Sequence, residues 1–598
     1  MIAEISASLI CLRKAFVFPW RKARGRATPS TVTKTQVHKL PQDPILVRLL
    51  ASSHHHQAKS SEAIIHDVTY GFQKNYLELL EDILQTAHRA RTALPPSMLD
   101  ERGILRESSS PYIGILVRSG YEFIVAFLAI RTMGGACMPI ASGILPEEAH
   151  FMVSKSKSMF LFAGEGCQEK AESICKFAEA QGDNLSWAPI SSDTKKPHKD
   201  HTNISVEIGD AQLDPSGPGV LLFTSGTTGR PKGVVLPRSH PSFPDRTKGG
   251  VVLTYRAGHW IAGTQGLIGP VLSGKTLHIL QANASAEELL DAMMRYRPTQ
   301  MLFTPTLLRQ MKTLVLAKGG PPEQYAAGFQ GMSAIRCSSA PIEPSLREFW
   351  TRLTGLPFEN IYGATETGGA VCRALSRPNG SIGTPLPGNE LKLSEGHCGE
   401  ILVKTRAMFT HYIGDEEKTR AAFDKDGFYK TGDMAELKDG EYFFAGRAAT
   451  DYISFRFFQI PALVVEASLM DLPYVADACV LGVPYHEARQ LCGAVIQLRH
   501  DCTEEVVNLA KIRADLAGVI AAYMLPVVLR VLKEGEQLPR TDSGKPIKRR
   551  ILSEFLGTTE WFPAENLPDS VEYFGCALPV MDEKTAGAWD WAGMQVAQ

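Results

Sequence analysis

The interpretation of the fold rests on residues 222–234, which read LFTSGTTGRPKGV. This segment follows an apolar run and brings Ser and Thr hydroxyls, glycines and the cations Arg230 and Lys232 into one loop. Glycines let backbone N–H groups converge on an anion, the hydroxyls add hydrogen-bond donors, and the two cations supply countercharge. The segment therefore predicts a phosphate-binding loop after a buried strand, and it indicates a protein that handles nucleotides.

A formal Walker A match lies elsewhere, at residues 269–276 (GPVLSGKT). A P-loop must open a helix after its GK[ST] residues, but the strand-like residues 277–280 follow here. The loop at 222–234 is not a Walker A motif either, because Lys232 is followed by Gly233. Both observations disfavour a generic kinase or GTPase.

Length and charge limit the classes of function. The chain has 598 residues and a formal net charge of −1, which predicts several packed units and offers no field for nucleic acid or an anionic membrane surface. The cysteines are scattered without a CxxC pair, so we expect reduced thiols in an intracellular protein, with neither a zinc site nor a disulfide framework. No stretch reaches about 18 uncharged apolar residues, so we expect no transmembrane span. The expected partners are small molecules, and the oligomeric state stays open.

The first 39 residues differ in composition from the rest. Eight Lys and Arg residues face a single acid, Glu4, amid Ser and Thr. This composition is typical of a transit peptide, and a disordered basic extension of a cytosolic enzyme explains it equally well. The expected localisation is therefore mitochondrial or cytoplasmic.

Strand-like and helix-like segments alternate along the body of the chain. We expect helices at 76–91 and 123–133 and strands at 114–117, 134–140, 220–223, 277–280, 301–303 and 334–337. This alternation predicts a large α/β domain of βα units with mixed or parallel sheets.

The pattern changes near residue 446. Two long apolar segments at 475–483 and 494–498 look like paired strands of a smaller α+β unit. We expect a leader at 1–39, an N-terminal domain at 40–446, a C-terminal domain at 447–556 and a tail without periodicity at 557–598.

Residues 360–368 (NIYGATETG) place an aromatic ring, two hydroxyls and a carboxylate within a short turn. A ring such as Tyr362 stacks on adenine, hydroxyls reach phosphates, and an acid such as Glu366 holds the magnesium ion that neutralises them. Asp433 follows a Gly turn in residues 428–433 (FYKTGD) and is suited to accept hydrogen bonds from a ribose diol. The pattern is that of a purine nucleotide site.

Together these segments resemble the AMP-forming adenylate superfamily of acyl-CoA synthetases, luciferases and peptide-synthetase adenylation domains. The resemblance covers about residues 40–556 and is greatest to malonyl-CoA-synthetase-like acyl-CoA ligases. It implies that the nucleotide is bound by Thr224, Ser225, Gly226, Thr227, Thr228, Gly229, Arg230, Pro231, Lys232, Gly233, Ser339, Ala340, Tyr362, Gly363, Ala364, Thr365, Glu366, Thr367, Asp433, Arg447 and Lys545.

The resemblance also implies catalytic roles. Lys545, in residues 538–545 (LPRTDSGK), matches the lysine of a mobile C-terminal loop and would stabilise charge during transfer. Glu366 would be the Mg²⁺ ligand, and Thr224 would act in the phosphate loop. His259 lies where the family keeps a histidine at the acyl pocket, although a hydrogen-bonded core histidine explains it as well.

The implied activity is that of an AMP-forming acyl-CoA ligase that uses ATP, Mg²⁺ and coenzyme A. A carboxylic acid would attack ATP to give acyl-AMP and pyrophosphate. The C-terminal domain would then reorient about a hinge after Arg447 and admit the thiol of CoA. The expected acid is fatty or polyketide-derived, in lipid or secondary metabolism.

Departures from the family keep alternatives open. Ser454 replaces a lysine, Arg456 and Phe457 replace two glycines, and Val464 replaces a glutamate. The two bulky side chains would narrow the path of the thiol. An acyl-adenylating enzyme that loads a carrier protein or hydrolyses the adenylate is therefore the enzymatic alternative.

Two further departures concern the acyl substrate. The segment at 234–258 is shorter than in the family by roughly a helix and is rich in proline, which suggests a remodelled acyl pocket or a nucleotide-binding protein without turnover. Ser333 stands where the malonyl branch has an arginine, and the direction of Arg336 is open. A monocarboxylic acid is thus favoured, with a malonyl- or dicarboxyl-CoA synthetase as the alternative.

Overall fold

The computed structural model describes residues 36–55, 62–106, 110–190, 204–224, 231–240, 249–282, 284–317, 321–340, 342, 344–377, 380–447, 451–455, 458–486, 488–499, 502, 507–540, 545–558, 562, 568 and 570–575. These residues fall into two compact units. Unit 1 lies within Met1–Ser225, Arg230–Ala284 and Ala407–Glu416, and unit 2 within Gly226–Gly229, Ser285–Arg406 and Glu417–Gln598.

Unit 1 is built on three sheets whose strands lie within its described part. The largest has the order β20-β10-β9-β5-β4-β6-β7, and the others are β11-β12-β2-β3 and β1-β8. Their bounds are β1 Gln36–Gln42, β2 Ile65–Asp67, β3 Phe72–Lys74, β4 Tyr112–Leu116, β5 Ala136–Ile140, β6 Phe160–Ala163, β7 Ser186–Pro189, β8 Ile204–Gln212, β9 Pro218–Thr224, β10 Lys232–Pro237, β11 Val251–Thr254, β12 Thr276–Ile279 and β20 His411–Tyr412.

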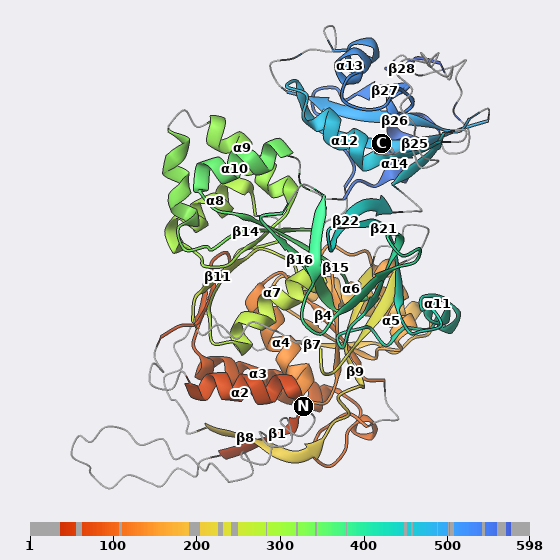
Figure 1. Ribbon diagram of the computed structural model, residues 1–598. Helices are drawn as coiled ribbons and strands as arrows, with labels where there is room; N and C mark the ends of the chain where they lie inside the picture. Colours follow the sequence, from red (N-terminus) through yellow and green to blue (C-terminus); the bar gives the residue numbers. More distant parts are fainter. Residues whose placement is uncertain are drawn as a thin grey trace. The chain divides into compact units, whose positions relative to one another are not determined.

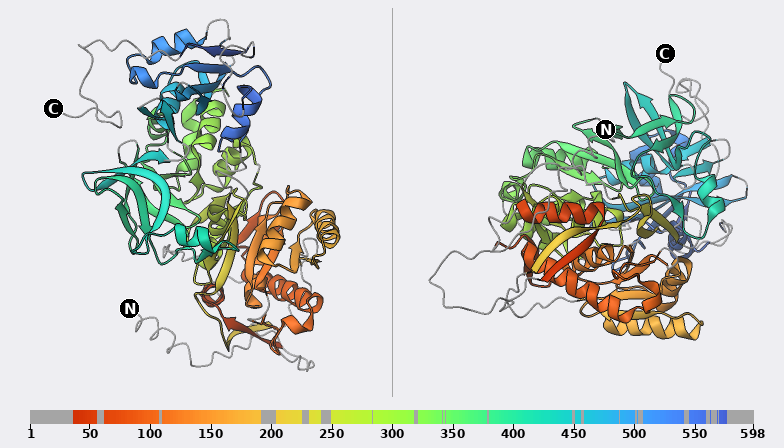
Figure 2. Two further views of the ribbon diagram at one scale, coloured as in Figure 1. Left: turned by 90° about the vertical axis from the view of Figure 1, so that its right-hand side faces the viewer. Right: turned by 90° about the horizontal axis from the view of Figure 1, so that it is seen from below.

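Parallel pairing holds the centre of the largest sheet, from β9 through β5 and β4 to β6 and β7. Every residue of β4 is buried, as expected for a parallel strand covered on both faces. Helices α5 (Pro146–Ser156) and α6 (Gln168–Ala180) cover one face of this sheet (Figure 2).

The other helices of unit 1 begin and end where the sequence supplies caps. Helix α3 (Tyr76–Ala93) starts with a capping box in which Asn75 and Glu78 bond each other's backbone N–H groups. Ser119 caps α4 (Gly120–Thr132), which packs against α3 (Figure 1). The remaining helices of unit 1 are α2 (Pro44–His55), α7 (Ile261–Leu272) and a 3-10 turn at Pro96–Met98.

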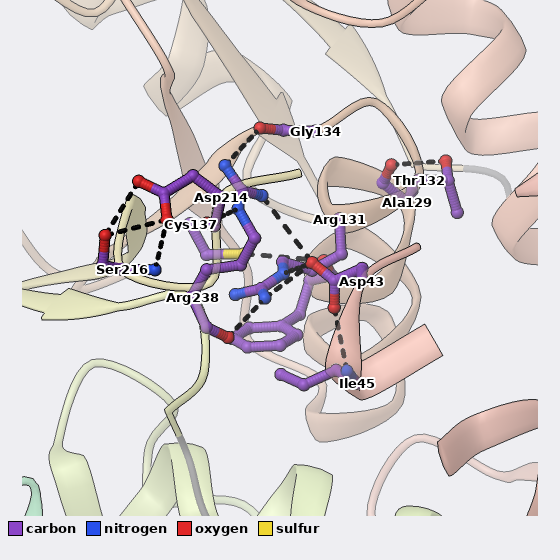
Figure 3. A network of polar contacts seen from close by, with 11 residues as sticks. Asp43, Ile45, Ala129, Arg131, Thr132, Gly134, Cys137, Asp214, Ser216 and Arg238 are labelled. Atoms are coloured by element: carbon purple, nitrogen blue, oxygen red, sulfur yellow. Dashed lines mark hydrogen bonds and ion pairs between the residues drawn. The ribbon is translucent and has the colours of Figure 1, made fainter. Parts of the chain in front are cut away.

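A buried ionic network holds the base of the β9–β10 hairpin (Figure 3). Nε of Arg131 donates to Oδ2 of Asp43 at 2.8 Å, and its Nη2 donates to the carbonyl of Arg238 at 2.7 Å, just beyond the end of β10. Arg238 in turn donates to the carbonyl of Gly134 at 2.9 Å. Because the Arg131 and Asp43 side chains are 0% exposed, the network belongs to the packed core.

Unit 2 contains a long mixed sheet and a second, smaller sheet. The long sheet has the order β13-β14-β15-β16-β17-β22-β21-β19-β18 among the described residues. Figure 1 labels β14, β15, β16, β21 and β22 of this sheet. Its strands are β13 Leu302–Phe303, β14 Ile335–Ser338, β15 Phe358–Ala364, β16 Gly369–Leu375, β17 Ser381–Pro385, β18 Glu390–Leu393, β19 Cys398–Lys404, β21 Tyr429–Lys438 and β22 Glu441–Arg447. The helices with them are α8 Ala286–Tyr296, α9 Pro305–Ala317, α10 Pro344–Thr354, α11 Glu416–Ala421 and a 3-10 helix at Pro322–Phe329.

The second sheet of unit 2 comes from the C-terminal part of the chain. Its order is β24-β23-β26-β27-β28, with β25 also paired to β26. The elements are β23 Tyr452–Phe455, β24 Phe458–Pro461, α12 Ala462–Met470, β25 Val475–Tyr485, β26 Arg489–Leu498, α13 Leu509–Leu516, a 3-10 turn Ala522–Met524, β27 Val528–Val531, α14 Lys548–Phe555 and β28 Val571–Tyr573. These elements enclose a hydrophobic core of their own.

The predicted α/β class with mixed and parallel sheets is confirmed, and most expected segments lie within three residues of the observed elements. The Walker A match at 269–276 spans the end of α7 and the turn into β12, so no helix opens after it. One expectation was wrong: the C-terminal segment that we took for a tail contributes β28, which pairs antiparallel with β27. Three residues are too short a strand for its period of two to stand out.

The described residues include no helix with both the length and the apolar character needed to cross a membrane.

Candidate functional site

Asp433 and Arg447 face each other across the β21–β22 ladder of unit 2. Antiparallel pairing puts the two residues in direct register, and Nε of Arg447 donates to Oδ1 of Asp433 at 2.7 Å. The Thr431 hydroxyl accepts from the backbone N–H of Asp433 at 3.0 Å. The short hairpin thus explains why a separation of fourteen residues brings these two groups together.

Tyr362 completes this cluster from another strand of the same sheet. It lies on β15, and its hydroxyl donates to Oδ2 of Asp433 at 2.7 Å. Burial and the neighbouring carboxylate of Asp433 raise the pKa of the Tyr362 phenol well above its ordinary value, so the hydroxyl stays protonated and remains a donor. Tyr362, Asp433 and Arg447 form a group that we call the carboxylate cluster.

The turn between β15 and β16 fixes the residues that follow Tyr362. A Cβ at Gly363 would lie 2.0 Å from the carbonyl oxygen of Gly369, so only glycine fits there. The buried Thr367 hydroxyl accepts from the Ala364 N–H at 3.0 Å and donates to the Gly369 carbonyl at 2.8 Å. The Thr367 hydroxyl thus closes the turn, and its place near phosphate stays a prediction.

Thr365 and Glu366 lie in the same turn, between the two strand ends. Both are partly exposed. A carboxylate oxygen is the kind of ligand that Mg²⁺ prefers, so Glu366 has the right donor chemistry for the expected metal role.

A strained turn follows β14 of the same sheet. Ser339 has a φ of +85°, which is rare for a residue with a side chain and is found most often at ligand sites. Its hydroxyl lies 3.5 Å from that of Ser338, and both Ser339 and Ala340 are exposed. The turn therefore presents the Ser339 hydroxyl to solvent, and the expected nucleotide contact of Ser339 and Ala340 stays a prediction.

Lys545 interacts electrostatically with the carboxylate cluster. The surrounding protein and the positive charge of Arg447 lower the pKa of its ammonium group, and Asp433, Asp451 and Glu366 raise it in part. The side chain nevertheless keeps much of its surface open to solvent. Lys545 thus interacts electrostatically with Asp433, the candidate ribose ligand, and with Glu366, the candidate Mg²⁺ ligand, within unit 2.

The predicted phosphate loop joins β9 to β10 in unit 1. Thr224 ends β9, Lys232 begins β10, and the two residues pair across the hairpin. The Lys232 ammonium lies 5.4 Å from the ring centre of Tyr412. Residues 225–230, with the predicted Ser225, Gly226, Thr227, Thr228, Gly229 and Arg230, lie outside the described residues; the predicted Pro231 and Gly233 lie within them.

His259 lies between β11 and α7 of unit 1 and is partly buried. Its ring centre is 5.3 Å from that of Trp260. Neither observation distinguishes an acyl-pocket histidine from a core histidine, so its role stays a prediction.

The direction of Arg336 is now defined. Parallel pairing of β14 with β15 puts Arg336 opposite Glu359, and its Nε donates to Oε2 of that residue at 2.5 Å. Arg373 approaches the other carboxylate oxygen of Glu359 at 3.3 Å. Ser333 is exposed and carries no charge.

Some supporting residues were not among the predicted site residues. Thr431 lies in the FYKTGD segment and Arg540 in the LPRTDSGK segment, so both were within quoted motifs. Asp477 on β25, which pairs with Arg540 at 2.6 Å, follows no recognisable pattern. The folding of the C-terminal sheet brings Asp477 next to Arg540.

Comparisons with known proteins agree with this geometry. Residues 59–413 match the AMP-binding enzyme family, and residues 464–545 match the AMP-binding enzyme C-terminal domain. The chain is 30% identical over 553 residues to acyl-CoA ligase oryP of Aspergillus oryzae, which covers 90% of this chain and 96% of that protein. It is 25% identical over 488 residues to the mitochondrial malonate–CoA ligase ACSF3 of Mus musculus, covering 74% of this chain and 81% of that protein.

Solved structures share the fold. ATP-bound MatB from Rhodopseudomonas palustris superposes with a TM-score of 0.69 at 20% identity, covering 86% of this chain and 99% of that one. The anthranilate CoA ligase AuaEII in complex with anthranoyl-AMP gives a TM-score of 0.70 at 19% identity, covering 86% and 97%. The resemblance drawn from the sequence motifs is confirmed: the chain belongs to the AMP-binding enzyme family.

Proposed function

We propose that this protein is an AMP-forming acyl-CoA ligase that activates a monocarboxylic acid. The observation that carries the proposal is the carboxylate cluster. Oδ1 and Oδ2 of Asp433 each accept one hydrogen bond, from Arg447 and Tyr362 at 2.7 Å. A carboxylate offers about four acceptor positions, so acceptor capacity remains for the two hydroxyls of a ribose.

The first step is transfer of the AMP group to the acid. A carboxylate oxygen forms a bond to the α-phosphorus, the bond between that phosphorus and the bridging oxygen of pyrophosphate breaks, and pyrophosphate leaves with the electron pair. Lys545 is proposed to stabilise the negative charge that moves in this step. Thr224, Lys232 and the rest of the loop are proposed to hold the phosphates that leave.

Magnesium fits one residue of the described site. Glu366 supplies a carboxylate in a turn whose backbone is fixed by Thr367 and Gly363. When bound, Mg²⁺ neutralises phosphate charge. The described residues hold no cluster of three or more His, Cys, Asp or Glu side chains suited to a metal, which agrees with a metal that is shared with ATP phosphates.

The second step is attack of the CoA thiolate on the acyl carbon, with AMP as the leaving group. The predicted obstruction by Arg456 and Phe457 lies outside the described residues, so transfer to a carrier-protein thiol stays the alternative. Replacing both residues with glycine separates the two. A large gain in thioester without a gain in adenylate would mean that these side chains hinder CoA.

The acid class follows from the charges near β14. Binding a second, distal carboxylate would call for a cation not already used by the protein. Arg336 is paired with Glu359 at 2.5 Å, and Ser333 carries no charge. We therefore propose an acid without a distal carboxylate, fatty or polyketide-derived, in place of malonate. For the compartment, we propose the mitochondrion or the cytoplasm, the two alternatives that the basic composition of residues 1–39 leaves open.

The test is carboxylate-dependent ATP–pyrophosphate exchange with malonate, succinate, benzoate, octanoate and palmitate. Lys545→Ala is expected to lose exchange by at least about 100-fold, because it removes the cation that acts on the transferred group. Lys511→Ala is the matched control, since Lys511 forms an i,i+4 ion pair with Asp515 on helix α13 of the C-terminal part.

Each outcome decides something. Exchange with a monocarboxylic acid that fails in Lys545→Ala supports the proposal. Exchange that is strongest with malonate or succinate contradicts the acid class. Silence across the panel, with ATP binding intact, would favour a nucleotide-binding protein without turnover over the ligase.

A further inference from the structure

The segment that carries Lys545 is closed at its base. Arg540 and Pro546 form an isolated antiparallel bridge, and the backbone N–H of Ile547 donates to the carbonyl of Pro539 at 2.8 Å. Two backbone contacts therefore join the chain before residue 541 to the chain after Lys545. We call the described residues 539–540 and 545–547, which flank residues 541–544 outside the described part, the lysine loop.

One side chain ties the base of the lysine loop to the C-terminal sheet. Nη2 of Arg540 donates to Oδ2 of Asp477 at 2.6 Å. The two side chains are 21% and 25% exposed, so water screens this ion pair less than it screens a surface pair. The other oxygen of Asp477 accepts from the Ala478 N–H at 3.0 Å, which fixes the direction of the carboxylate.

Asp477, the partner of Arg540, lies on a long, well-paired strand of the C-terminal part. Asp477 belongs to β25, which pairs with β26 over nearly its whole length. The following residues Cys479, Val480 and Leu481 are almost completely buried in the C-terminal core. The Arg540 side chain is therefore held by a residue of a well-ordered core strand.

A second ion pair acts at the far end of the lysine loop. The ammonium of Lys548, at the start of α14, lies 3.3 Å from Oδ1 of Asp451. Oδ2 of Asp451 accepts from the backbone N–H of Arg447 at 3.1 Å. The lysine loop is thus held at one end by Asp477 on β25 and at the other by Asp451, which follows Arg447 in the chain.

We propose that Arg540 and Asp477 are positioning residues that hold Lys545 in place for adenylate formation. The inference rests on the proposed role of Lys545 in that step. A displacement of about 1 Å at a reacting group can cost about 100-fold in rate, whereas the C-terminal fold rests on its buried hydrophobic core and not on this one ion pair. Loss of the pair should therefore affect the step that uses Lys545 and leave the thioester step almost unchanged.

The experiment compares the two half-reactions in Arg540→Met, Asp477→Asn and Arg540→Lys. Adenylation is followed by ATP–pyrophosphate exchange with the best acid of the panel above, and thioester formation by mixing CoA with the chemically prepared adenylate of that acid. We expect exchange to fall about tenfold or more in Arg540→Met and Asp477→Asn, mostly in kcat, with thioester formation within about twofold of the parent. Arg540→Lys keeps a cation and should restore part of the exchange.

The matched control is Glu554→Gln, which breaks the exposed Arg550–Glu554 pair in α14 at 2.6 Å without touching the base of the loop. It should leave both half-reactions unchanged. Hydrogen exchange of the Ile547 amide gives a readout that needs no acid, and it should become faster in Arg540→Met and Asp477→Asn.

Failure of this inference differs from failure of the proposed function. If Lys545→Ala loses exchange but Arg540→Met and Asp477→Asn keep it, the positioning role is wrong and the ligase proposal stands. If Lys545→Ala keeps full exchange, the role of Lys545 itself is wrong. An equal loss in both half-reactions would show that Arg540 supports the fold and not the lysine, as would a further loss when Arg540→Met is added to Lys545→Ala.

Discussion

Among the arginine-held carboxylates of the described residues, Asp43 and Asp433 differ in how much of their surroundings stays open to a ligand. Asp43 in unit 1 faces Arg131 and Arg238, and its side chain and that of Arg131 are 0% exposed (Figure 3). Asp433 in unit 2 faces Arg447, whose side chain is 39% exposed. The first carboxylate is enclosed by the protein, and the second lies beside a group that solvent and ligands can reach.

The groups around the two carboxylates differ in the same way. Near Asp43, burial and the charge of Arg131 lower the pKa of His240 to about 3, so the imidazole ring is neutral. The guanidinium groups of Arg131 and Arg238 share the single carboxylate of Asp43. Near Asp433, the donors come from Tyr362 and Arg447, both in motifs that the sequence singled out. The comparison teaches that an Arg–Asp pair is a candidate ligand site where acceptor capacity remains and the arginine is exposed, even though the Asp433 side chain itself is only 6% exposed.

The comparison predicts its largest effect for Asp43→Ala. This change leaves Arg131 and Arg238 buried without a counterion and removes the acceptor of the Ile45 N–H at the start of α2. Loss of one partner of a buried pair costs about 3–5 kcal/mol. We expect the thermal unfolding of unit 1 to shift down by roughly 10 °C, with the KM for ATP unchanged in protein that is still folded.

Calorimetry of the full chain measures this shift, and Asp210→Ala is the control. Asp210 also approaches an arginine, Arg102 at 3.8 Å, but its side chain is 94% exposed. A surface pair of this kind contributes at most about 1 kcal/mol. If Asp43→Ala raised the KM for ATP without changing the melting temperature, the division between the two carboxylates would be wrong.

The next effect in size is expected for Asp433→Asn. Hydrogen bonds to a charged acceptor are worth about 1.5–3 kcal/mol, so the KM for ATP should rise about 10- to 100-fold while the melting temperature changes little. The sharper measurement repeats the assay with 2′,3′-dideoxy-ATP. The parent should prefer ATP strongly, and Asp433→Asn should lose most of that preference. A preference that survives the substitution would remove Asp433 from the ribose role.

Much of the local geometry at the candidate nucleotide site follows from the sequence, because it depends on short segments of the chain. The turn after Tyr362 needs glycine at 363, since a Cβ there would meet the Gly369 carbonyl. Asp433 and Arg447 flank a tight hairpin, so their pairing follows from strand register. In both places residues close in sequence determine the geometry, and a motif records it.

Other features depend on contacts between distant segments, which the sequence did not indicate. The direction of Arg336 follows from its pairing with Glu359 on the neighbouring strand, and the anchor of the lysine loop needs Asp477, 63 residues away from Arg540. Strand β28 was too short to show a period.

The smallest effect is expected for Tyr362→Phe, which tests whether the second oxygen of Asp433 is also held for the ligand. The substitution keeps the aromatic ring that is predicted to lie by adenine and removes only the hydroxyl that donates to Oδ2 of Asp433 at 2.7 Å. Because we expect the hydroxyl to act on ATP only by orienting Asp433, its loss should cost ATP binding no more than one ordinary hydrogen bond, about 0.5–1.5 kcal/mol. The KM for ATP should therefore rise about 2- to 12-fold, with kcat nearly unchanged. If the hydroxyl acts by orienting Asp433, this rise should disappear in the Asp433→Asn background and with 2′,3′-dideoxy-ATP. An equal rise for both nucleotides would assign the hydroxyl to the adenine side of the site, and Asp433 would then be held by Arg447 and the Thr431 turn without help from Tyr362.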